Sequence, residues 1–210
     1  MFDNAKKGIK KIYKAEILSI IATIVAIVAA VLLVILGSFV KDGQVNSTDV
    51  ISTISLIVAA IIGVVAYIMN LIGIGNASKD SEDFKNALYM TIAALIVSVV
   101  ASILNKSKPS MSHALGVSEN ILEMLAAYYV INGCIGIAKK LAKPELEQYG
   151  NKSMKLFLTV WILSVVVDVL SKILGSGSVI AGIIGIIALI LALVSYVIYL
   201  KLLNKTLNAL

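Results

Sequence analysis

The chain has 210 residues, of which 60% are hydrophobic and 14% are charged, and its mean hydropathy is +1.00. Soluble domains have about 45–50% apolar and about 25% charged residues, so this composition excludes an ordinary soluble protein. The net charge of +6 comes from lysines that flank long apolar runs without forming one basic face. We therefore predict an all-α integral membrane protein and expect no nucleic-acid partner.

The first sixteen residues have two contrasting helical faces. Phe2, Ile9, Ile12 and Tyr13 can share one face, and five lysines crowd the other. This pattern is typical of an amphipathic helix that lies in the membrane interface. We predict such a helix for residues 1–16. It would act as a topology anchor or, alternatively, as a sensor of anionic lipids.

Six apolar segments follow, each long enough to cross a hydrocarbon core of about 30 Å. The predicted spans are residues 17–40, 50–74, 84–104, 117–138, 153–174 and 178–200, and they form a six-helix transmembrane domain over residues 17–210. Small residues recur along the spans at intervals of three or four. One such stripe consists of Ala87, Thr91, Ala94, Ser98 and Ala101. We interpret these stripes as packing faces, which small residues favour in lipid; a pore lining is the alternative.

The distribution of lysine predicts the topology. With six spans, 14 of the 18 lysines fall on the side that holds both termini, and the exceptions are Lys41, Lys106, Lys108 and Lys172. The positive-inside rule then places both termini in the cytoplasm, with anionic lipids at the inner face of a cell membrane. The absence of arginine and the many Ile and Asn residues suggest a bacterial genome of low GC content.

The even-numbered spans share a short pattern. The matching segments are Tyr67–Asn70, Tyr129–Asn132 and Tyr196–Tyr199. They suggest three tandem two-helix hairpins in the same orientation. Apolar helices built from few residue types also match by chance, so the sequence leaves both interpretations open.

Acidic side chains within the spans are the first candidates for a functional site. Asp168 lies in the fifth span, where a carboxylate at a helix centre costs about 2.5–3.5 kcal/mol, and Lys172 follows one turn later. The two form either a local ion pair or part of a proton or cation site. Glu119 and Glu123 could join Asp168 in an outer vestibule. Alternatively, Glu119 stabilises a helix N-terminus and Glu123 faces water or a partner.

A second candidate site lies in the inner halves of the spans. Asn70 and Asn132, with Tyr67 and Tyr129, could bind a polar solute there. The alternative is helix glue, because hydrogen bonds between transmembrane helices contribute about 0.6 kcal/mol on average. An aromatic belt would also explain the tyrosines.

The sequence carries little that suggests catalysis. It has one histidine, His113, and one cysteine, Cys134, and no nucleophile, phosphate-loop or metal-binding motif. We expect no metal, no cofactor and no enzymatic activity. We favour a structural or regulatory membrane module, as a homo-oligomer or a subunit with a membrane partner. The alternative is a transporter or channel for an ion or small solute that uses the outer-half carboxylates.

Overall fold

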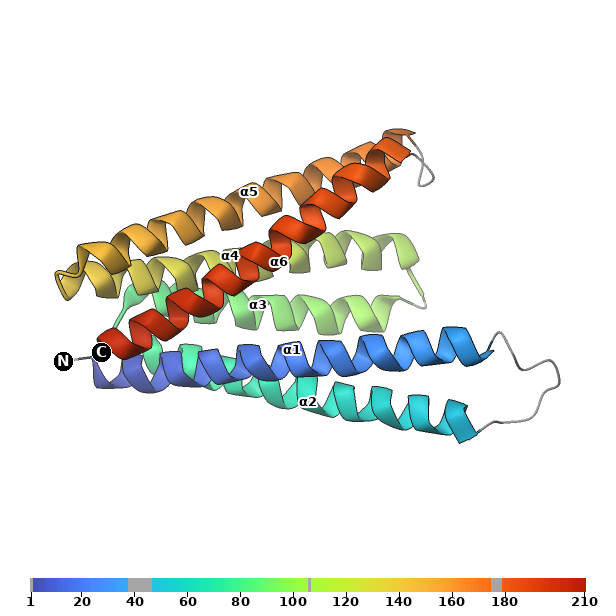
Figure 1. Cartoon of the computed structure of the whole chain (residues 1–210), viewed down its shortest axis with the longest axis horizontal. Coiled ribbons are helices and arrows are strands. Elements are labelled where there is room, and N and C mark those ends of the chain that lie inside the picture. Colours follow the sequence, from blue (N-terminus) through green and yellow to red (C-terminus); the bar gives the residue numbers. More distant parts are fainter. Residues whose placement is uncertain (1, 38–46, 106, 175–178) are drawn as a thin grey trace.

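The chain folds into long helices joined by short connections. The computed structural model describes residues 2–37, 47–105, 107–174 and 179–210; within them, the side chains of residues 33–37, 47–50, 109, 113, 168, 171–174 and 179–182 lie outside the description. The helices are α1 (Asp3–Gly37), α2 (Ser47–Ala77), α3 (Glu82–Leu104), α4 (Pro109–Lys140), α5 (Pro144–Leu174) and α6 (Val179–Ala209) (Figure 1). All six are long and apolar enough to cross a membrane. The prediction of an all-α chain with six candidate spans is confirmed.

Two helices begin earlier than hydropathy predicts. α4 starts at Pro109 instead of residue 117, and α5 starts at Pro144 instead of residue 153. Proline suits the first turn of a helix, because its fixed φ is helical and the N–H that it lacks would have no partner there. Hydropathy marks the apolar part of a span, whereas the helix itself continues into polar residues. Glu123 consequently lies near the middle of α4, away from its outer end.

The N-terminal segment is continuous with the first span. α1 runs from Asp3 to Gly37, so the amphipathic helix predicted for residues 1–16 continues directly into the first span; its location in the membrane interface stays a prediction. Its side chains Phe2, Ile9 and Ile12 are buried in the protein core. They pack there because the ends of neighbouring helices offer apolar partners, such as Leu203 of α6.

α1 and α2 touch through their backbones where two glycines face each other. A Cβ built on Gly8 would lie 2.5 Å from the carbonyl oxygen of Gly73, and one built on Gly73 would lie 2.9 Å from that of Gly8. Side chains cannot fit at these distances. The close approach brings Ile12 against α2 and holds the N-terminal part of α1 in the bundle.

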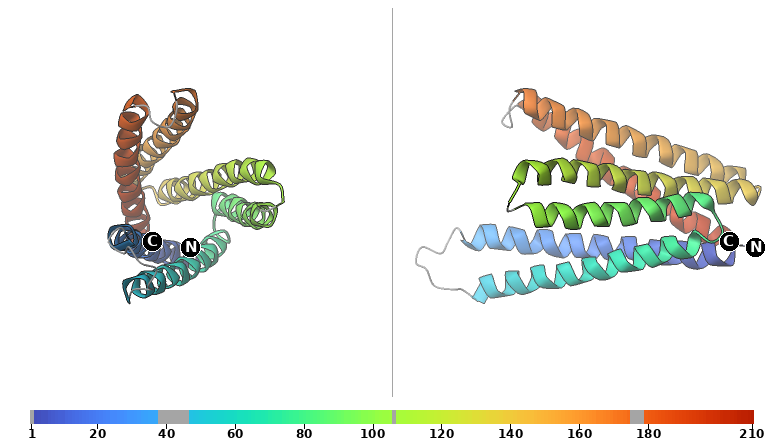
Figure 2. Two further views of the ribbon diagram at one scale, coloured as in Figure 1. Left: turned by 90° about the vertical axis from the view of Figure 1, so that its right-hand side faces the viewer. Right: turned by 180° about the vertical axis from the view of Figure 1, so that it is seen from behind.

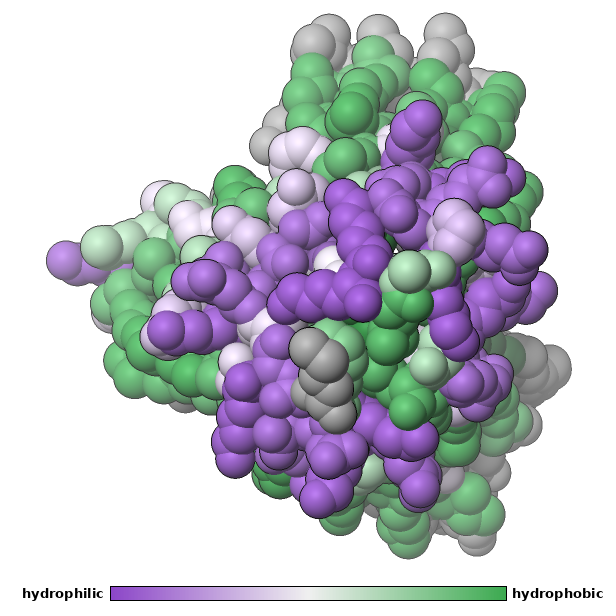
Figure 3. Space-filling model, turned by 90° about the vertical axis from the view of Figure 1, so that its left-hand side faces the viewer, coloured by the Kyte–Doolittle hydropathy of each residue, from purple (hydrophilic) through white to green (hydrophobic). Residues whose placement is uncertain are grey.

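The helices are arranged as three pairs. The most extensive contacts join α1 to α2, α3 to α4 and α5 to α6, and further contacts join α4 to α5 and α1 to α6. Both termini lie at one end of the bundle, which we call the inner end, and the pairs spread apart from it (Figure 1, Figure 2). The face of the inner end is largely hydrophilic (Figure 3), as expected from the lysine distribution.

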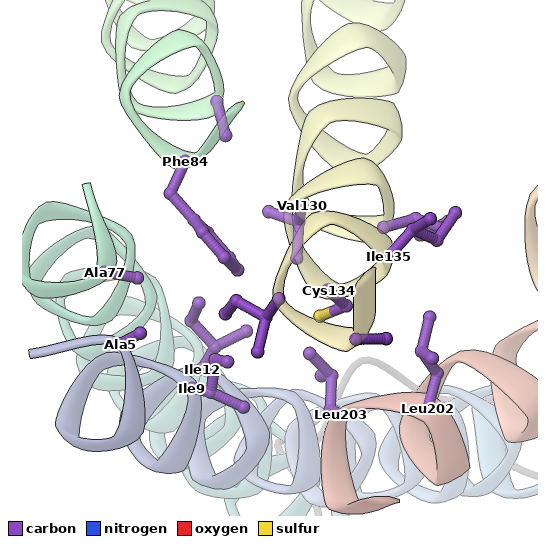
Figure 4. Close-up of a cluster of buried hydrophobic side chains, with 14 of the residues drawn as sticks. Ala5, Ile9, Ile12, Ala77, Phe84, Val130, Cys134, Ile135, Leu202 and Leu203 are labelled. Carbon is purple, nitrogen blue, oxygen red and sulfur yellow. The ribbon is translucent and has the colours of Figure 1, made fainter. Parts of the chain in front are cut away.

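A solid hydrophobic core closes the inner end, and all six helices contribute to it. Its largest fully buried side chains are Ile131, Ile137 and, labelled in Figure 4, Phe84, Ile9, Ile12, Leu202 and Leu203. The ring of Phe84 takes the place of a side chain on α4: a Cβ at Gly133 would lie 2.6 Å from its Cε2 atom. The core therefore anchors the six helices at one end, and they diverge beyond it.

Candidate functional site

A cavity of about 380 Å³ lies where the helix pairs begin to diverge, and residues of all six helices line it. Small side chains leave the space open, including Ala94, Ala126 and Ala192. Its polar lining residues are Glu16, Tyr67, Asn70, Thr91, Glu123, Ser195, Tyr196 and Tyr199. The volume falls in the range of pockets that bind small molecules, about 300–1,000 Å³.

The two ends of the cavity differ. Ile74, Val130 and Ile131 line it and also belong to the hydrophobic core, so the core closes the cavity toward the inner end. Glu123 is exposed although it lines the cavity. The cavity therefore opens at the level of Glu123, away from the two termini.

One carboxylate in the cavity, Glu16, joins the first and last helices. The hydroxyl of Tyr196 donates a hydrogen bond to Glu16 Oε2 at 2.6 Å and lies 3.2 Å from the Glu16 carbonyl oxygen. The rings of Tyr196 and Tyr199 are 6.3 Å apart. Glu16 was not among the site residues predicted from the sequence. One feature of the sequence could have identified it. Glu16 is an acid between the lysine-rich segment and the first apolar run, and it lies on the helical face opposite most of the lysines.

The hydroxyl groups of α2 and α3 that line the cavity already have protein acceptors. Tyr67 donates to the carbonyl oxygen of Thr91 at 3.3 Å, and Thr91 donates to that of Ala87 at 2.8 Å. In contrast, the side-chain oxygen Oδ1 of Asn70 is buried and has no hydrogen-bond donor among the described residues. Asn70 thus has an unsatisfied acceptor, which is rare in folded proteins, and this atom is sealed from the open space of the cavity.

The predicted inner polar site is divided between two places. Tyr67 and Asn70 line the cavity. Asn132 donates to Asp83 Oδ1 at 2.8 Å and so cross-links α4 to the start of α3. Tyr129 packs edge-on against Tyr128, with ring centroids 5.4 Å apart, and contacts the hydrophobic core. In the α4 segment of the predicted repeat, Val130 and Ile131 line the cavity, whereas Tyr129 and Asn132 do not.

The predicted outer carboxylates are only partly described. Glu123 lines the cavity, whereas Glu119, one turn earlier, is half-buried and is not among the lining residues. Asp168 and Lys172 belong to α5, but their side chains lie outside the description, as does that of His113. The predicted ion pair between Asp168 and Lys172 therefore stays a prediction. Among the described residues, the acids that line the cavity are Glu123 and Glu16.

A separate polar cluster lies at the inner end. Asp80, in the turn between α2 and α3, accepts hydrogen bonds from the Asn4 side chain at 3.0 Å and from the Ala5 N–H at 2.8 Å. Partial burial raises the pKa of Asp80, but these hydrogen bonds outweigh it and hold the pKa below its usual value. Asp80 thus caps the first turn of α1 from another element.

The chemistry available in the cavity is that of acceptors and aromatic rings. Its described lining includes two carboxylates and no basic side chain. Among the described residues there is no group of three His, Cys, Asp or Glu side chains that could hold a metal ion.

A comparison of the chain with protein-family models, with curated proteins and with solved structures finds no match.

Proposed function

We propose that this protein is a membrane carrier that binds a small solute in the cavity between its six helices. The observation that supports the proposal is a cavity of about 380 Å³ with polar groups on its wall, inside a bundle of six helices that could each cross a membrane. Polar side chains inside a membrane are costly and often mark a solute or ion pathway. The closed inner end and exposed Glu123 correspond to a carrier open on the outer side.

The proposal includes an orientation. Most lysines belong to the ends of the helices, and to the turns between them, on the side that holds both termini. This inner end presents a hydrophilic face (Figure 3). By the positive-inside rule this end faces the cytoplasm of a bacterial cell, where its lysines meet anionic lipids. The three helix pairs would then be tandem hairpins, each crossing the membrane out and back.

The favoured interpretation from sequence, a structural or regulatory module, is the second candidate. It is supported by the solid inner core, in which Ile9, Phe84 and Leu203 are fully buried. Such a module has no need of a hydrated cavity, so access of water to the cavity distinguishes the two candidates.

Two cysteine variants of α6 test the proposal, in a Cys134→Ala background reconstituted into lipid vesicles. Ser195 lines the cavity and is 7% exposed, whereas Leu193 is 61% exposed on the outside of the bundle. In a membrane, lipid covers Leu193 and water fills the cavity. We therefore expect a neutral, hydrophilic methanethiosulfonate to label Ser195→Cys and not Leu193→Cys, although Ser195 is the more buried residue.

The opposite results are equally informative. Two unreactive cysteines, in variants that remain monodisperse, would mean a dry bundle and would favour the structural module. Faster labelling of Leu193→Cys would contradict the membrane location itself.

A further inference from the structure

We propose that the solute bound in the cavity is a small organic cation, which pairs with the carboxylate of Glu123; this inference rests on the carrier function proposed above. It follows from three properties of the cavity wall: its charge, the balance of its hydrogen-bonding groups and its aromatic rings.

The described wall of the cavity contains acidic side chains and no basic one. Glu16 and Glu123 are its ionisable acids, and in the part of the chain that the structure describes neither forms a salt bridge. A carboxylate taken out of water is strongly disfavoured unless it takes up a proton or a positive charge accompanies it. A cationic solute would supply that charge, whereas an anion would be repelled by both groups.

The hydrogen bonds of the wall leave acceptors free. The hydroxyl hydrogens of Tyr67, Thr91 and Tyr196 are all used on protein oxygens. Within the described residues the carboxylate of Glu123 has no hydrogen bond; Asn70 Oδ1 also lacks a donor there, but it is sealed from the open space of the cavity. Ser195 and Tyr199 carry hydroxyls that can donate or accept. A ligand with N–H groups, such as an ammonium, matches this surplus of acceptors.

The size and the aromatic lining indicate an organic cation in place of a bare ion. The volume of about 380 Å³ corresponds to about a dozen water molecules, at about 30 Å³ each. Phe157 and three tyrosines contribute rings to the wall, and aromatic faces attract ammonium groups. The described residues also hold no cluster of ligands for a metal ion.

The two carboxylates have different roles in this proposal. Glu123 is exposed at the open end of the cavity and is free to pair with the entering cation. Glu16 accepts a hydrogen bond from Tyr196 deeper in the cavity, so it keeps α1 joined to α6. Loss of the Glu123 charge should therefore reduce cation selectivity most directly.

Charged thiol reagents test the inference with the Ser195→Cys, Cys134→Ala protein in vesicles. The probes are a methanethiosulfonate that carries a trimethylammonium group and one that carries a sulfonate. Their labelling rates are each divided by the rate with a free thiol in solution. We expect the normalised rate of the cationic reagent to exceed that of the anionic one by about tenfold or more, the enrichment that a cleft of one charge sign produces.

Matched variants identify the source of the preference. Glu123→Gln should lower it severalfold, whereas Glu145→Gln, the same change of charge at the exposed start of α5, should leave it unchanged. Added tetramethylammonium should slow labelling of Ser195→Cys, and the same concentration of glucose or acetate should not.

Each proposal fails by a separate result. Equal normalised rates for the two reagents, or protection by glucose or acetate alone, would overturn the cation assignment and leave the carrier function standing. A cysteine that no reagent labels would overturn the carrier function. Because the rate ratio is measured with Glu123 intact, the test holds even if Glu123→Gln does not fold.

Discussion

Replacing Gly8 by alanine should push α1 away from α2 at their closest approach. The added Cβ would lie 2.5 Å from the carbonyl oxygen of Gly73 and 2.6 Å from the backbone nitrogen of Ala77. Both neighbours are helix backbone, so rotation of a side chain cannot relieve the contact. Overpacking costs about 1–3 kcal/mol, and we expect about 2–3 kcal/mol here because a whole helix must move.

Gly63→Ala is the matched control. Gly63 also lies in this helix pair, on α2, but a Cβ built there would meet nothing within 4 Å. Alanine has a higher helix propensity than glycine by about 1 kcal/mol. Both variants share this gain, so the difference in their free energies of unfolding isolates the steric cost at Gly8.

Unfolding by SDS in mixed micelles measures this difference. The fluorescence of Trp161, the single tryptophan, reports the transition. Gly8→Ala should be less stable than Gly63→Ala by about 2–3 kcal/mol. Equal stabilities would refute the contact between Gly8 and Gly73, and with it the docking of the N-terminal part of α1 against α2.

Two polar contacts at the inner end lead to further predictions in the same unfolding assay. A double-mutant cycle that replaces Asn132 and Asp83 by alanine measures the free energy of their hydrogen bond. We expect an interaction free energy of about 0.6 kcal/mol, and at most about 1.7 kcal/mol. If the effects of the two substitutions are additive, the side chains do not interact. Asp80→Ala should cost about 1 kcal/mol at pH 7, because α1 loses its cap. The folded pKa of Asp80 lies below the unfolded value of about 3.9, so this contribution is complete above that value and is lost as the pH falls through the folded pKa. A cost that is unchanged at pH 2–3 would contradict the role of the carboxylate.

Composition and periodicity were sufficient to predict the helices. Six apolar runs of membrane-spanning length predicted six helices, and the structure has them. The predicted ends were less accurate, because hydropathy reports where a span is apolar and not where its backbone hydrogen bonds stop. α4 and α5 therefore extend eight and nine residues beyond their predicted starts, 117 and 153, to Pro109 and Pro144.

The candidate site was only partly predictable. Glu123, Asn70 and Tyr67 stood out because polar side chains are unexpected in apolar helices, and all three line the cavity. Asn132 has the same local pattern as Asn70, yet it bonds to Asp83. Local sequence reveals that an amide lies within a span, but the rotation of the helix and its neighbours decide what the amide meets.

Long apolar runs and the placement of lysines are local properties, so the sequence by itself determined an all-helical chain with six candidate spans. The tertiary structure alone decided two further features. One is the burial of the N-terminal segment, which depends on Gly8 meeting Gly73 across two helices. The other is the cavity, where Glu16 and Tyr196 meet although 180 residues separate them. Such pairings depend on helix rotation and crossing, which no local pattern encodes.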